Sequence, residues 1–96
     1  MNHFVIKTSV LVSKSAEKQL RKIPRHIKES LRVWMETVER LGVREARKFP
    51  GLHDEPLHGS RKGQRSVRLN KTYRAIYIET DHGLELLVIE VNKHEY

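Results

Sequence analysis

The chain contains no cysteine among its 96 residues, which excludes disulfide bonds and metal sites built from thiolates. It has only three prolines and five glycines, and we find no repeat, linker or low-complexity segment in it. No apolar stretch approaches the roughly 20 residues of a membrane span. No cation precedes the apolar run of MNHFVIKTSVLVS, so this start is unlike a signal peptide. We therefore expect one small domain over residues 1–96, without membrane contact and located in the cytoplasm.

Positive charge, in contrast, is abundant. The net charge is +7 and the sequence pI is about 10.0. Six cations between Leu57 and Ile78, with no Asp or Glu among them, are interleaved with strand-forming residues. They are Arg61, Lys62, Arg65, Arg68, Lys71 and Arg74. A sheet would hold them in fixed positions, which suits a polyanion. Nucleic acid phosphate is the first candidate and an acidic protein partner is the second.

The pattern of apolar residues in the first half predicts a strand followed by two helices. His3 to Val12 is rich in strand formers, and either Ser13 or Ser15 can cap a short first helix. Pro24 suits the first turn of a second helix that stops at Gly42. The apolar stripe of this second helix comprises Ile27, Leu31, Trp34, Met35, Val38 and Leu41.

The second half predicts a loop and then three strands. Residues 50–59 have the Pro and Gly content of a loop, and the strands expected after it are Gln64–Asn70, Tyr73–Thr80 and Leu84–Asn92. Connections this short join antiparallel neighbours. The whole chain is therefore expected to be an α+β fold, with an N-terminal strand and a two-helix hairpin packed on a small, mainly antiparallel sheet.

The turn between the first two of these strands decides where two arginines lie. A three-residue turn, Asn70 to Thr72, places Arg68 opposite Arg74, whereas a two-residue turn places Arg74 opposite Leu69. Like charges directly opposite each other are destabilising unless an anion joins them. The three-residue alternative would therefore mark a phosphate site.

The sequence shows no pattern typical of metal or cofactor binding. His53 and His58 lie in the predicted loop, and no two histidines are spaced as metal ligands on a helix. A Gly-rich phosphate loop and a nucleophile elbow are also missing. We expect neither a metal nor a cofactor.

A phosphodiesterase that uses no metal remains open to this chain. Cleavage of RNA by its own 2′-OH needs a base, cations for the phosphorane and an acid for the departing 5′-oxygen. The chain offers Glu55, the arginines and His94, a residue type suited to proton transfer near neutral pH. Strand alternation predicts that His94 shares a face with Val88, Glu90 and Asn92.

Several short motifs, taken in order, resemble the RelE/ParE toxin superfamily of bacterial type II toxin–antitoxin systems. They are Glu55-Pro56-Leu57, Arg68-Leu69, Tyr73-Arg74-Ala75-Ile76-Tyr77 and Val91-Asn92-Lys93-His94-Glu95-Tyr96. The resemblance covers nearly the whole chain and implies a RelE-like fold. Members of the YoeB kind are similar in having a Glu-Pro-Leu loop whose Glu acts as the base, and a C-terminal His-Tyr.

The resemblance implies an mRNA-cleaving toxin and assigns roles to five residues. Glu55 would be the general base, Arg74 would stabilise the phosphate and Arg68 would be a further active-site arginine. His94 would protonate the leaving group, and Tyr96, separated from it here by Glu95, would match the terminal tyrosine. A second group would bind RNA phosphates: Arg61, Lys62, Arg65, Lys71 and Lys93.

The same resemblance implies partners and leaves two alternatives. Family members act mostly on mRNA in the ribosomal A site, so ribosome and rRNA contact is implied, as is a cognate antitoxin that covers the basic face. ParE members share the fold but poison DNA gyrase and lack this catalytic set, and Glu55 together with His94 argues against that branch. The other alternative is a basic nucleic-acid-binding module without catalysis.

Overall fold

The computed structural model describes residues 8–93. Its helices are α1 (Lys14–Leu20), α2 (Arg25–Leu41) and α3 (Val43–Ala46), and its strands are β1 (Ser9–Val12), β2 (Glu55–Pro56), β3 (Gln64–Arg68), β4 (Tyr73–Thr80) and β5 (Glu85–Lys93). Short 3-10 turns lie at η1 (Pro50–Leu52), η2 (Gly59–Arg61) and η3 (Asp81–Gly83). The strands form one sheet in the order β1-β5-β4-β3-β2, with β1 parallel to β5 and the other neighbours antiparallel. The predicted α+β fold is confirmed.

The short helix α1 closes part of a sheet edge. Ser13 caps it, because its Oγ accepts a hydrogen bond from the Ala16 N–H at 3.1 Å. β1 pairs with β5 only as far as Val88. Beyond that point the Gln19 side chain accepts a hydrogen bond from the Val91 N–H at 2.7 Å. Gln19 thus satisfies a backbone donor that the end of β1 leaves open.

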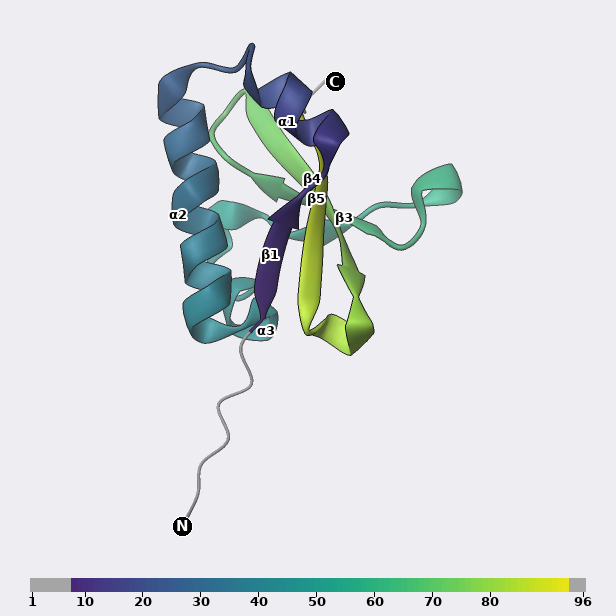
Figure 1. Ribbon diagram of the computed structural model, residues 1–96. Coiled ribbons are helices and arrows are strands. Elements are labelled where there is room, and N and C mark those ends of the chain that lie inside the picture. The colour runs from purple at the N-terminus through teal and green to yellow at the C-terminus, as the bar shows by residue number, and fades with distance from the viewer. Residues whose placement is uncertain (1–7, 94–96) are drawn as a thin grey trace.

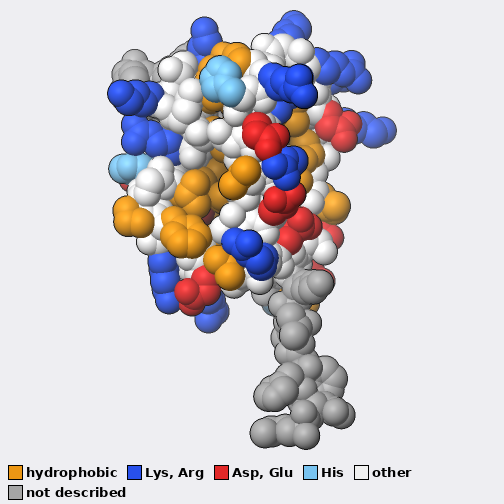
Figure 2. Space-filling view, turned by 90° about the vertical axis from the view of Figure 1, so that its left-hand side faces the viewer, with side chains coloured by type: hydrophobic (Ala, Val, Ile, Leu, Met, Phe, Trp, Pro, Cys, Tyr) orange, Lys and Arg blue, Asp and Glu red, His pale blue; other side chains and the backbone are white. Residues whose placement is uncertain are grey.

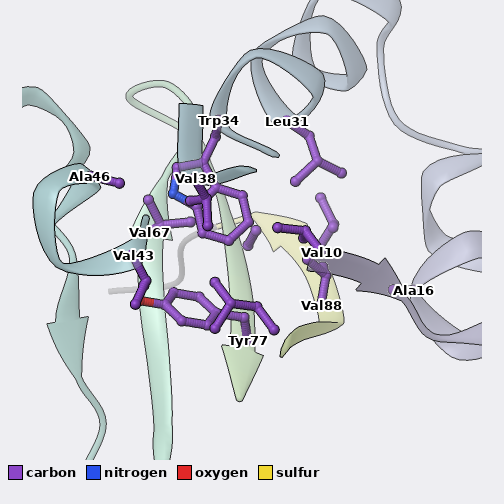
Figure 3. Packing of buried hydrophobic residues seen from close by; sticks show 13 residues of the cluster. Val10, Ala16, Leu31, Trp34, Val38, Val43, Ala46, Val67, Tyr77 and Val88 are labelled. Atoms are coloured by element: carbon purple, nitrogen blue, oxygen red, sulfur yellow. The ribbon is translucent and has the colours of Figure 1, made fainter. Parts of the chain in front are cut away.

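The apolar stripe of α2 packs on the sheet largely as predicted. Its buried residues are Ile27, Leu31, Trp34 and Val38, whereas Met35 is half-buried. Leu41, at the end of the stripe, is 42% exposed, and the core continues through Val43 and Ala46 of α3 instead. The Trp34 ring lies 5.1 Å from the Tyr77 ring of β4, between the helix and the sheet (Figure 3).

The sheet has two unlike sides at β3 and β4. We call the side that packs on α2 the helix side; it carries Arg65, Val67, Ala75 and Tyr77. The other side, the open side, carries Gln64, Ser66, Arg68, Arg74 and Ile76, because side chains alternate along a strand. Figure 1 shows α2 on one side of the sheet and the segment between β2 and β3 projecting on the other.

A β-bulge in β5 changes which residues share a side. Ile76 pairs with Glu90 but Tyr77 pairs with Val88, so Ile89 is an extra residue in β5. Val88 and Val91 therefore both face the helix side and are buried, while Glu90 and Asn92 face the open side. The prediction that Val88 shares a face with Glu90 and Asn92 is wrong, because strict alternation does not cross a bulge.

Candidate active site

The β3–β4 turn sets two arginines opposite each other. Arg68 pairs with Arg74 in the strand register, so the three-residue turn is the alternative that the structure adopts. The Asn70 Oδ1 accepts hydrogen bonds from two backbone N–H groups of the turn, those of Thr72 at 2.8 Å and Tyr73 at 2.7 Å. Two guanidinium groups fixed in this way repel each other, and an anion that contacts both would relieve the repulsion.

Neither arginine is neutralised within residues 8–93. No ion pair in that part of the chain includes Arg68 or Arg74. Within the described range 8–93, the Nε of Arg74 is buried without a hydrogen-bond partner, and so is the Oδ1 of Asn92, which faces Arg74 from β5. A buried donor without an acceptor costs free energy. An anionic ligand at Arg74 would supply the missing acceptor.

Glu55 reaches the same side from the edge strand β2. It pairs with Ser66, and Pro56 pairs with Arg65. Since cross-strand partners share a face, Glu55 lies on the open side, one diagonal from Arg68, and residues two apart on a strand are separated by about 7 Å. One pocket of about 200 Å³ is lined by His53, Glu55, Ser66, Arg68, Asn70, Lys71, Tyr73 and Arg74. Three of the predicted catalytic residues, Glu55, Arg68 and Arg74, are brought together there.

Strand β2 itself was missed, because Pro56 is typical of loops. Proline cannot donate to a β ladder, but an edge strand tolerates it where its nitrogen faces away from the neighbour. The Leu57 N–H donates to the Gln64 carbonyl at 2.9 Å and ends the short ladder. Only two residues pair, so β2 is a weak strand whose position depends on other contacts.

His53 is a pocket residue that the sequence analysis considered only as a metal ligand. Its backbone is left-handed, with φ 43° and ψ 50°, and non-glycine residues in this conformation concentrate at functional sites. It stands two positions before Glu55, but its left-handed backbone breaks the alternation of extended chain, so the sequence held no signal for its place in the pocket.

The C-terminal candidates lie outside the described residues. β5 is described as far as Lys93, which pairs with the pocket residue Tyr73. The roles of His94 and Tyr96 stay predictions.

The cations predicted to bind RNA do not all lie on the same side of the sheet. Arg61 lies over the open side, where it donates to Gln64 at 2.8 Å and to Glu90 at 2.6 Å. Lys62, Lys71 and Lys93 are exposed.

Arg65 does not join this group. It faces the helix side, and its Nε donates to Asp54 Oδ1 at 2.6 Å. Charge alone placed Arg65 and Arg68 together, but three positions along a strand put their side chains on opposite sides of the sheet.

An apolar groove lies on the α2 side of the molecule, where Figure 2 shows hydrophobic side chains gathered at the surface. Its volume is about 450 Å³, and its apolar lining includes Val33, Trp34, Phe49, Leu52 and Leu69. Val33 is 50% and Phe49 46% exposed. Arg68 lines both this groove and the polar pocket, so the two hollows meet at one side chain.

Residues 8–93 contain neither a metal-ligand cluster nor a membrane-spanning helix. No set of three His, Cys, Asp or Glu in that range is arranged to hold a metal ion. None of the described helices has the length and apolar character needed to cross a membrane.

Several solved structures with this fold are toxins or toxin–antitoxin complexes. The RelBE2 toxin–antitoxin complex from Mycobacterium tuberculosis matches with TM-score 0.70 and 21% identity, over 93% of this chain and 100% of that one. A YoeB/ParE toxin from Agrobacterium tumefaciens matches with TM-score 0.69 and 22% identity, over 92% and 100%. The intact RelBE complex of E. coli matches with TM-score 0.63 and 24% identity, over 93% and 99%. At these identities the likeness shows the fold.

Comparison of the sequence with models of protein families identifies the family. No curated protein matches the chain. The family model described as the ParE toxin of the type II toxin–antitoxin system parDE matches residues 10–95. That match covers nearly all of the chain, and it agrees with the resemblance drawn from the motifs. The chain therefore belongs to the ParE toxin family, within the RelE/ParE superfamily of type II toxin–antitoxin toxins.

Proposed function

We propose that this toxin is an endoribonuclease that cleaves mRNA without a metal and thereby inhibits translation. The observation that carries the proposal is that one pocket holds Glu55 together with the opposed pair Arg68 and Arg74. A carboxylate supplies a base, and two guanidinium groups without ion-pair partners in residues 8–93 supply the charge that a phosphorane needs.

In the proposed reaction, the Glu55 carboxylate takes the proton of the ribose 2′-OH. The 2′-oxygen then attacks phosphorus while Arg68 and Arg74 hold the phosphate oxygens. The bond from phosphorus to the 5′-oxygen breaks, and His94 gives its proton to that oxygen. The products are a 2′,3′-cyclic phosphate and a free 5′-hydroxyl, so atoms and protons balance.

The remaining cations define the RNA path. Lys62, Lys71 and Lys93 are exposed and Arg61 lies over the open side, so they bind phosphates of mRNA and of rRNA when the toxin acts on the ribosome in the cytoplasm. The partner that neutralises the toxin is a cognate antitoxin, which covers the basic side with an acidic or amphipathic segment that folds on binding. Several solved structures of this fold are themselves toxin–antitoxin complexes.

Inhibition of DNA gyrase is the second candidate, because the matching family model is that of ParE. In that case the pocket residues would contribute nothing to toxicity. The fold is common to both branches, so the test depends on Glu55 and the opposed arginines.

The test is primer extension on cellular mRNA after induction of the wild-type chain and of Glu55→Gln. Discrete cleavage sites with the wild type, absent with Glu55→Gln, support the nuclease. With purified chain and ribosomes, cleavage should persist in chelator and leave a 2′,3′-cyclic phosphate. DNA damage without mRNA cleavage, and equal toxicity of the two chains, would support gyrase inhibition.

A second measurement separates the acid from the base. His94→Gln should slow cleavage by about 100–10,000-fold. A substrate whose 5′-oxygen is replaced by sulfur needs no proton on the leaving group, so it should rescue His94→Gln and leave Glu55→Gln slow. Rescue of Glu55→Gln, or of neither variant, would overturn the two assignments.

A further inference from the structure

The residue before Glu55 is a buried carboxylate held at both oxygens. Asp54 has a side chain only 2% exposed. Its Oδ1 accepts a hydrogen bond from Arg65 Nε at 2.6 Å, and its Oδ2 accepts one from the Tyr77 hydroxyl at 2.5 Å. Arg65 also donates to the Asp54 backbone carbonyl at 3.3 Å. Side chain and backbone are therefore both held at the point where the chain enters β2.

The groups that hold Asp54 belong to the rigid part of the fold. Arg65 is in β3 and Tyr77 is in β4, where its ring packs on Trp34 of α2. Arg47, which follows α3, lies with its Nε 3.9 Å from Asp54 Oδ1 and donates to the Tyr77 hydroxyl at 3.3 Å. Arg47 also pairs with Glu79 of β4. We call Asp54, Arg65, Tyr77 and Arg47 the Asp54 clamp.

The clamp and the pocket lie on opposite sides of the sheet, one behind the other. Arg65 and Ser66 are adjacent in β3 and point to opposite sides, as do Asp54 and Glu55. Arg65 binds Asp54 on the helix side while Ser66 faces Glu55 on the open side. None of the four clamp residues lines the pocket.

A buried carboxylate costs free energy unless both of its oxygens are paired, so the contacts that pair Asp54 also fix its position. β2 has only two residues and one of them is proline. Its backbone pairing alone is too short to fix Glu55 to the accuracy that proton transfer requires, which is about half an ångström. The Asp54 side chain adds the anchorage that the strand lacks.

We infer that the Asp54 clamp is a positioning device that holds Glu55 in the pocket with Arg68 and Arg74. The inference rests on the proposed function, in which Glu55 is the base. The clamp residues touch no reacting atom and act through the backbone between Asp54 and Glu55.

Two variants loosen the clamp to different degrees. Asp54→Asn removes the charge that Arg65 binds. Tyr77→Phe keeps the ring that packs on Trp34 and removes only the hydroxyl, so it tests the clamp with the aromatic packing retained. Thr8→Val is the matched control, because it deletes another buried hydroxyl, whose bond to the Gly83 carbonyl is 3.4 Å long and remote from the pocket.

The kinetic test uses the full chain with ribosomes and mRNA. Displacement of a catalytic group by about 1 Å can lower a rate by about 100-fold, so Asp54→Asn should lower kcat by about that factor, and Tyr77→Phe by less, with KM little changed. Thr8→Val should match the wild type. In a Glu55→Gln background, Asp54→Asn should cause no further loss, since the group that it positions is already gone. A further loss of similar size there would overturn the inference.

A second measurement does not depend on cleavage. Hydrogen exchange at the Leu57 amide reports the ladder at the end of β2, and exchange at the Leu69 amide, bonded to the Tyr73 carbonyl at 3.0 Å, reports the β3–β4 turn. Asp54→Asn and Tyr77→Phe should each speed exchange at Leu57 and leave Leu69 unchanged. Unchanged protection at Leu57 refutes the clamp even if the toxin is a nuclease. Faster exchange at Leu57 with no cleavage by the wild type supports the anchoring of β2 while refuting the proposed function.

Discussion

Strand β3 carries Arg65 and Arg68 three positions apart, and the two differ in almost everything except side-chain type. Arg65 lies on the helix side and is bound to a buried carboxylate. Arg68 lies on the open side, faces another arginine and has no ion pair within residues 8–93. An arginine bound to a buried carboxylate supports the fold, whereas an arginine that faces another arginine is ready to bind an anionic ligand. The predictions below test this contrast, starting with the largest expected effect.

Removal of the paired arginine should damage the fold. Arg65→Ala leaves the Asp54 charge buried beside weaker partners, and breaking a buried ion pair costs about 3–5 kcal/mol. Urea denaturation should show a loss of that order in the free energy of unfolding. Arg68→Ala is the control and should be neutral or slightly stabilising, because it removes repulsion from Arg74. Equal losses from both variants would erase the distinction between the two sides.

Removal of Arg74, the arginine that faces Arg68, should damage activity instead. Arg74→Ala should slow mRNA cleavage by about 100–1,000-fold, the usual effect of losing one donor to a charged transition state. Growth inhibition on induction should disappear, while antitoxin binding persists. Circular dichroism and urea denaturation check that the fold is kept. An unfolded Arg74→Ala chain would make Arg74 a structural cation.

The helix side should also respond to alkaline pH. Burial raises the pKa of Tyr77, and its hydrogen bond to Asp54 adds to the shift, although Arg47 opposes it. The folded chain therefore holds this proton above pH 10, where an unfolded tyrosine releases it, so stability falls as pH rises. The free energy of unfolding should drop by up to about 1.4 kcal/mol per pH unit from this group above pH 10. Tyr77→Phe should lack that component when urea midpoints at pH 9, 10 and 11 are compared, and identical slopes would contradict the assignment.

The open side should respond to salt. Affinity for RNA should fall with ionic strength, and Lys71→Gln should reduce the slope of log affinity against log salt by about 0.7–0.9, the share of one phosphate contact. Lys48→Gln is the matched control. Lys48 lies away from the pocket, and its Nζ is 3.0 Å from a carboxylate oxygen of Glu45. Filter binding over a series of salt concentrations measures both. A slope that neither variant changes would remove Lys71 from the contact surface.

Local patterns were enough to predict much of the fold and the central arginine pair. The α2 stripe and the caps proposed for α1 depend on residues a few positions apart; the stripe was found, and Ser13 was one of two caps left open. The three-residue turn was one of two open alternatives, and it fixed Arg68 opposite Arg74.

The features that sequence reasoning missed depend on partners distant in the chain. The bulge at Ile89 is visible only as a slip in pairing with β4, and it put Val88 on the opposite side of the sheet from Glu90 and Asn92. Arg65 looked like a surface cation because its anion, Asp54, stands in a stretch with loop composition. β2 was hidden by Pro56, since pairing to β3 and not propensity makes it a strand.

The strand order has a consequence for how the chain is made. β5 lies in the sheet between β1 and β4, yet it is synthesised after every other described strand. Ser9 must wait for Glu85 before it can pair, and such distant contacts form slowly because a long loop has to close first. Until β5 leaves the ribosome, β1 has no neighbour and β4 lacks one of its two. Translation itself therefore delays completion of the sheet, because the strand that joins β1 to β4 is the last of the described strands to be made.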